Sequence, residues 1–155
     1  MATGNDITIR TASIEDLSAV IGMLTNDPLG QHREDADSGL NSAYLSAFNA
    51  IDVDPNNQLL VATSGTQVVG VLQLTFIPNL TYTGGLRAQI EGVRVHESVR
   101  GQGVGKLIVA HAIEQARGRN CVMVQLTTDK RRPDALAFYE SSGFAPSHEG
   151  MKLLL

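Results

Sequence analysis

The chain has few of the residues on which several protein classes depend. It contains no tryptophan and a single cysteine, Cys121, so no disulfide can form within it and nothing favours a secreted, disulfide-stapled fold. No stretch reaches the roughly 18 apolar residues of a membrane span. The first residues lack the basic and apolar regions of a signal peptide. These absences favour a cytoplasmic protein with no membrane partner.

Positive charge is also scarce. The chain has 12 basic and 16 acidic residues and a net charge of −4, so no overall positive field would attract nucleic acid. Its 155 residues, 43% of them hydrophobic, are typical of a single globular domain over residues 1–155. Such a domain buries a core without a metal, and no metal site is expected.

The most informative stretch is a strand, turn and helix in the middle of the chain. Residues 87–95 contain alternating and β-branched side chains that predict a strand, and apolar residues over 104–117 recur at the spacing of one helical face. Between them, Gly101, Gly103 and Gly105 leave backbone N–H groups unpaired at the positive end of the helix. This arrangement predicts a site for an anion, and we interpret it as a pyrophosphate loop.

The residue spacing of this stretch does not match either of two common phosphate-binding loops. A Walker loop needs four residues between its glycines and Ser or Thr after its lysine, whereas Gly101 and Gly105 enclose three residues and Leu107 follows Lys106. A dinucleotide loop needs the spacing G-x-G-x-x-G, whereas the spacing here is G-x-G-x-G. Neither loop fits the sequence.

The pattern Arg100-x-x-Gly103-x-Gly105 after an apolar strand resembles the acyl-CoA pyrophosphate loop of the GNAT superfamily of acetyl-CoA-dependent N-acetyltransferases. The later run A-x-x-F-Y-x-x-x-G-F over residues 135–144 resembles the segment that this family carries on the helix after its fifth strand. The resemblance is closest over residues 87–145. The N-terminal half agrees only in the order of its elements.

The resemblance implies a mixed α/β fold, with a central, mostly antiparallel mixed sheet, a splayed parallel strand pair and flanking helices. Gly92 indicates either the bulge that opens this pair in the family or a small residue beneath a bulky neighbour. The terminal strand would offer an edge for a homodimer. Periodicity and turn residues place strands at 7–10, 58–63, 67–77, 87–95, 121–127 and 147–155, and helices from Ser13 to about 26, at 40–51, at 103–117 and at 133–143.

The resemblance also implies that an acetyl group passes from acetyl-CoA to a primary amine, in a small molecule or an amino terminus, by direct attack in a ternary complex. Such a reaction needs a base and an acid. Glu91 is the candidate base, because two-residue spacing puts it on the face of Val93 and Val95 unless a bulge at Gly92 breaks that parity. A water chain is the alternative base. Tyr139 matches the family tyrosine that protonates the departing sulfur.

The resemblance further implies that the protein binds acetyl-CoA mainly through main-chain N–H groups. The N–H of Val93 or Val95 would stabilise the oxyanion that forms during the reaction. Arg132 departs from the family pattern, which often has Asn at this position. The basic cluster Lys130-Arg131-Arg132 would bind the CoA phosphates or an acidic group of the acceptor, or would simply lie on the surface. The cofactor-binding candidates are Val93, Arg94, Val95, Arg100, Gly101, Gln102, Gly103, Val104, Gly105, Lys106, Arg132 and Phe138.

Two alternatives to this function stay open. One is a non-catalytic acyl-CoA sensor or regulatory module of the same fold, and the other is a different phosphate-ligand binder. The acceptor would be shaped by the loops at 29–38 and 78–85, the second of which contains Tyr82. Cys121 lies in a short apolar run that predicts an inner strand, so we interpret it as an inert buried thiol.

Overall fold

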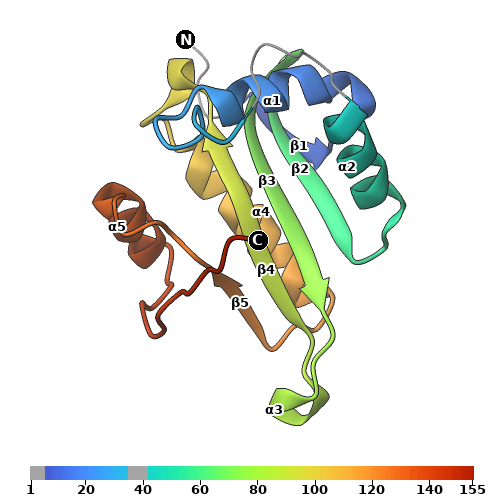
Figure 1. Ribbon diagram of the computed structural model, residues 1–155, viewed down its shortest axis with the longest axis vertical. Helices are drawn as coiled ribbons and strands as arrows, with labels where there is room; N and C mark the ends of the chain where they lie inside the picture. The colour runs from blue at the N-terminus through green and yellow to red at the C-terminus, as the bar shows by residue number, and fades with distance from the viewer. Residues whose placement is uncertain (1–5, 35–41) are drawn as a thin grey trace.

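The computed structural model describes residues 6–34 and 42–155. Five strands form one sheet in the order β1-β2-β3-β4-β5 (Figure 1). Neighbouring strands are antiparallel except for β4 and β5, which are parallel. The predicted mixed, mostly antiparallel sheet is therefore confirmed. The strands are β1 Ile7–Thr11, β2 Asn57–Ser64, β3 Gln67–Ile77, β4 Arg87–Val95 and β5 Met123–Leu126.

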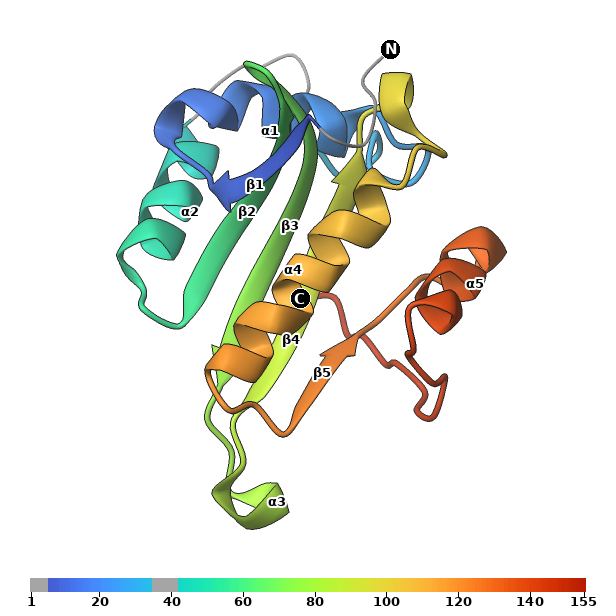
Figure 2. The same cartoon turned by 180° about the vertical axis from the view of Figure 1, so that it is seen from behind.

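Helices flank the sheet on both faces. α1 and α2 lie over one face and α4 over the other, as the two opposite views show (Figures 1 and 2). In the described residues, no helix has both the length and the apolar character that crossing a lipid bilayer demands. The helices are α1 Leu17–Thr25, α2 Ser42–Val53, α3 Thr81–Gly84, α4 Val104–Gly118 and α5 Pro133–Ser141, with 3-10 turns η1 Ile14–Asp16 and η2 Glu97–Val99.

Each face of the sheet has its own apolar core. Along β3, Leu72, Leu74 and Phe76 pack against α4, whereas Val71 packs with the residues of α1 and α2 on the opposite face. This alternation follows from the two-residue period of a strand. β3 is the central strand of the sheet and is covered on both faces, so it is a well-packed neighbour for β4.

The start of the first helix is fixed by a charged pair. The Asp16 carboxylate accepts a hydrogen bond from the N–H of Ser13 at 2.7 Å, so Ser13 begins the helix as predicted. Arg10 donates to both carboxylate oxygens, at 2.6 and 2.9 Å. Hydrogen bonding from Arg10 lowers the pKa of Asp16 to about 2. This pair ties β1 to the helix that follows it.

Two predictions about the C-terminal part are wrong. In the described residues β5 pairs only with β4, so it is an edge strand and not an inner one. Residues 147–155 form no strand, although Met151, Leu153 and Leu155 alternate. Their side chains are 94%, 85% and 116% exposed, because no described surface of the same chain covers them. Alternation shows which side chains would face a core, but it does not supply the core.

Candidate active site

β4 and β5 pair over only part of their length. Parallel pairing runs from Arg87 opposite Met123 to Ile90 opposite Leu126. β5 then ends and the chain leads away to α5, while β4 continues to Val95 (Figure 1). In the described part of the chain, the edge of β4 over residues 91–95 therefore has no partner strand on this side. Its backbone groups can accept an extended ligand between the two diverging strands.

A β-bulge lies where this free edge begins. Glu91 is opposite Gln73 and Arg94 is opposite Val71, so Gly92 and Val93 together face a single residue of β3. Gly92 has a φ of +63°, a left-handed angle that glycine adopts without a steric penalty. Of the two interpretations of Gly92, the bulge is therefore confirmed.

The bulge changes the face on which Glu91 lies. Val93 and Val95 pack toward the core beneath α4, whereas Glu91 is exposed and sits opposite Gln73. Gln73 lies on the other face, because its neighbours in β3 belong to the α4 core. The prediction that Glu91 shares a face with Val93 and Val95 is wrong, because the extra residue reverses the alternation. Glu91 instead shares its face with Arg94.

The glycine-rich turn leaves open space at the start of α4. Gly101 and Gly103 have φ angles of +76° and +85°, and a Cβ built on either would meet no atom within 4 Å. Gly105 differs, because a Cβ there would lie 3.3 Å from Cζ of Phe138 and 3.6 Å from Cγ2 of Val95. The absence of side chains thus lets α4 approach both β4 and α5 closely.

The first amides of α4 are available as donors. The first N–H bonded within the helix is that of Leu107, which donates to the carbonyl of Gly103 at 3.1 Å. The amides of Val104, Gly105 and Lys106 precede it and have no helical partner. The amide of Gln102 donates to Val99 at 3.2 Å and is already used within the turn. The predicted pyrophosphate loop therefore offers a positive helix end beside the end of β4.

Arg100 and Phe138 frame this helix end. The Nε of Arg100 donates to the carbonyl of Val95 at 3.2 Å, which brings an exposed guanidinium to the end of β4. Phe138 lies over Gly105 from the side of α5. The structure thus brings together the candidates of the glycine loop with those of β4 and α5.

Tyr139 projects from α5 into an aromatic cluster. Its ring packs edge-on against Phe138 and Phe144, with centroids 5.0 and 5.9 Å away. Burial raises the pKa of the Tyr139 hydroxyl, while the nearby charges of Arg94 and Arg132 act in the opposite direction. The hydroxyl therefore keeps its proton at neutral pH, as a proton donor must.

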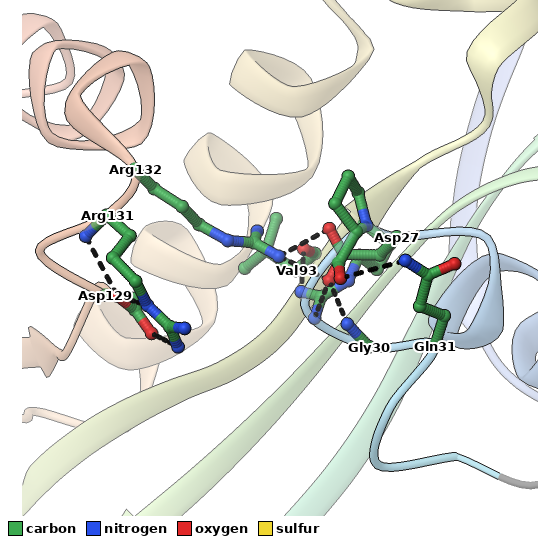
Figure 3. Close-up of polar contacts among 9 residues, drawn as sticks. Asp27, Gly30, Gln31, Val93, Asp129, Arg131 and Arg132 are labelled. Carbon is green, nitrogen blue, oxygen red and sulfur yellow. Dashed lines mark hydrogen bonds and ion pairs between the residues drawn. The ribbon is translucent and has the colours of Figure 1, made fainter.

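An aspartate that the sequence did not single out joins three elements at this site. The Asp27 carboxylate, just after α1, accepts a hydrogen bond from the N–H of Gly30 at 2.9 Å (Figure 3). It also binds Nη2 of Arg94, from β4, at 3.4 Å and Nη2 of Arg132, which precedes α5. The side chain of Asp27 is only 11% exposed. Its partners lie 67 and 105 residues away, so no local pattern could have indicated the cluster.

The two loops expected to shape the acceptor site lie in different places. Residues 26–34 follow α1 and bring Asp27 to Arg94 of β4, whereas residues 35–38 of the first loop lie outside the described residues. Tyr82 is 64% exposed on α3, at the end of β4 opposite the glycine loop (Figure 1). The first loop is therefore the one that borders the cluster.

Comparison with known proteins gives consistent matches. Residues 23–144 match the acetyltransferase (GNAT) family. An aminoalkylphosphonate N-acetyltransferase of Salmonella typhimurium is 31% identical over 106 residues, 68% of each chain. A glucosamine 6-phosphate N-acetyltransferase of Trypanosoma brucei brucei is 33% identical over 87 residues, 56% of this chain and 57% of that one. The crystal structure of a transcriptional regulator from Bacillus halodurans C-125 superposes with a TM-score of 0.94 at 52% identity, over 96% of this chain and 99% of that one.

Proposed function

Because the chain belongs to the GNAT family of acetyltransferases, we propose that it transfers the acetyl group of acetyl-CoA to a primary amine by direct attack in a ternary complex. Membership makes the chain an acyltransferase, and the family uses acetyl-CoA. One observation carries the proposal for this chain. The edge of β4 that no described strand pairs with lies beside the open N-terminus of α4, and Tyr139 lies near Arg94 of that edge.

The residues at this corner fit the cosubstrate. The amides of Val104, Gly105 and Lys106 would hold the pyrophosphate, and the open space at Gly101 and Gly103 leaves room for it. The other candidates would line its path, with Arg100 beside the phosphates, Arg94 contributing through its main chain, and the free edge of residues 93–95 beside the extended arm.

Glu91 and Tyr139 would carry the proton transfers. When bound, acetyl-CoA supplies an acetyl thioester that is activated toward an amine. Glu91 would remove the proton of the acceptor ammonium, directly or through water, and so free the lone pair that forms the N–C bond. As the C–S bond breaks, Tyr139 would donate its hydroxyl proton to the sulfur. The N–H of Val93 or Val95 would stabilise the charge on the carbonyl oxygen.

Direct attack is supported by the character of the single thiol. Burial raises the pKa of Cys121, which therefore stays protonated and is a poor nucleophile. A small acceptor is supported by the two curated relatives, whose names specify an aminoalkylphosphonate and glucosamine 6-phosphate. We therefore propose a small amine in preference to the amino terminus of a protein.

The experiment that tests this function measures free thiol released from acetyl-CoA across a panel of amines. Amine-dependent release with an N-acetylated product is expected.

A second candidate function, an acyl-CoA-responsive regulatory module, is favoured by the description of the B. halodurans relative as a transcriptional regulator. That candidate predicts binding of acetyl-CoA with no thiol release for any amine.

A further inference from the structure

Two guanidinium groups gather around the carboxylate of Asp27. Arg94 and Arg132 bind it directly. Burial lowers the pKa of Arg94, the charge of Asp27 opposes this shift, and the positive charges of Arg132 and Arg33 add to it. The two guanidinium groups and one carboxylate that pair here leave one positive charge without a partner charge.

Within residues 6–34 and 42–155, no second carboxylate pairs with these two guanidinium groups. In the described part of the chain, Asp27 is the only acidic residue that forms an ion pair with Arg94 or Arg132. Glu34 accepts a hydrogen bond from the Tyr44 hydroxyl at 2.7 Å. The side chain of Arg94 is 17% exposed, and its Nε is buried without a hydrogen-bond partner in that same part. An under-neutralised buried cation is costly unless something else binds it.

We propose that Arg94 and Arg132 bind a phosphate or phosphonate group on the acceptor, so that the substrate is a small primary amine carrying such a group. The proposal rests on the acetyl transfer proposed above. The sequence left Arg132 between the CoA phosphates and an acidic group on the acceptor. Its guanidinium meets Asp27 and Arg94 on the face of Glu91, which favours the acceptor.

The number of acceptor oxygens selects the kind of anion. A phosphate or phosphonate group offers three oxygens and a charge of about −1.5 to −2 at neutral pH, so both guanidinium groups can bind it, whereas a carboxylate offers two oxygens and a single negative charge. Guanidinium groups also bind such oxygens in a two-point fork. Arg132 uses Nη2 for Asp27, and its Nη1 and Nε have no partner among the described residues, so they can bind a ligand.

The position of the cluster limits the size of the acceptor. Arg94 and Glu91 lie on one face of β4, three residues apart, so their Cα atoms are separated by at most about 10 Å. An acceptor that reaches both needs only a short spacer between its amine and its anionic group. Arg132, the residue before α5, reaches Asp27 from the C-terminal part of the chain (Figure 3).

The first test compares matched amines with the unmodified chain. We expect kcat/KM for 2-aminoethylphosphonate to exceed that for propylamine by about 100-fold or more and that for 3-aminopropanoate by about 10-fold, because charge-assisted hydrogen bonds are lost in each analogue. Equal kcat/KM values for the phosphonate and propylamine would overturn the proposal. So would a preference for the carboxylate.

The second test uses variants of two adjacent arginines. Arg132→Gln should lower kcat/KM for the phosphonate about 10- to 100-fold more than it lowers kcat/KM for propylamine, mainly through KM. Arg131→Gln is the matched control, because Arg131 is 72% exposed and pairs only with Asp129 among the described residues. Equal losses for both amines would reveal a structural role and contradict the proposal. Arg132→Lys, which keeps the charge, should recover part of the affinity.

A binding measurement separates this inference from the proposed function. Calorimetric titration of 2-aminoethylphosphonate into the protein with free coenzyme A should show binding that Arg132→Gln weakens and Arg131→Gln does not. If the phosphonate binds in this way and no amine is acetylated, the result supports the anion site and contradicts the proposed acetyl transfer. If amines are acetylated and the phosphonate neither binds nor is preferred, the anion site fails alone.

Discussion

Gly103 offers the sharpest single substitution in the glycine-rich turn. It is the residue before α4 and has a φ of +85°, so Gly103→Val places a β-branched side chain in a left-handed conformation at a cost of about 1–2 kcal/mol. No atom lies within 4 Å of the added Cβ. The valine therefore meets open space in the turn that leads to the first amides of α4, and its effect on ligand binding exceeds its effect on folding.

The loss of affinity follows from the donors that would be blocked. A hydrogen bond to a charged group contributes about 1.5–3 kcal/mol. Displacing the pyrophosphate from two of the amides of Val104, Gly105 and Lys106 therefore weakens binding of coenzyme A by at least about 3 kcal/mol, or more than about 100-fold. Isothermal titration calorimetry of coenzyme A measures this directly.

Gly84→Val is the matched control for backbone strain. Gly84 has a φ of +72°, and a Cβ added there would lie 3.9 Å from the carbonyl oxygen of Asn79, but Gly84 lies on α3 at the opposite end of β4 (Figure 1). Both variants should melt about 2–8 °C below the unmodified chain, since each kcal/mol is worth about 2–4 °C in a chain of this size. Only Gly103→Val should lose coenzyme A. A folded Gly103→Val protein with an unchanged Kd would refute the assignment of the loop.

Three further predictions concern the proton-transfer residues and the folded state. Tyr139→Phe should lower kcat by about 100-fold and leave the KM for acetyl-CoA nearly unchanged in steady-state assays; an unaltered kcat would remove Tyr139 from the acid role. Glu91→Gln should lower kcat by at least about 10-fold, and a normal rate would instead assign the base to water. Because the folded pKa of Asp16 is about 2 and its ordinary value is 3.8, its pair with Arg10 stabilises the fold above pH 4 and loses this effect as pH falls toward 2. Asp16→Asn should therefore lower the free energy of unfolding by at most about 2 kcal/mol at pH 7 and much less at pH 2, as urea titrations at both pH values would show, and an equal loss at both would contradict this linkage.

The middle of the chain was predictable because its signals are local. The helix after the glycine-rich turn follows from residues adjacent in the sequence, whereas the sequence left two interpretations of Gly92 open. The face of Glu91 was not predictable by alternation alone, since it depends on whether the residue beside it forms a bulge. A count of positions gives the right face only when the ladder is regular.

The rest of the site depends on contacts between distant segments. Asp27 belongs to a short turn whose sequence indicates only the end of a helix, and its role appears when β4 and the start of α5 bring Arg94 and Arg132 to it. The C-terminal alternation of Met151, Leu153 and Leu155 likewise indicated a strand without a partner to pair with. Sequence patterns report what a segment favours, whereas the site is set by what the fold places beside it.

A crystal structure of the protein with coenzyme A is the most direct test of the proposed acetyl transfer. The pyrophosphate should lie within hydrogen-bonding distance of the amides of Val104, Gly105 and Lys106. The sulfur should lie between β4 and β5, beyond the last paired residues Ile90 and Leu126 and near the Tyr139 hydroxyl. Coenzyme A bound elsewhere, with side chains closing the space between these strands, would contradict the account.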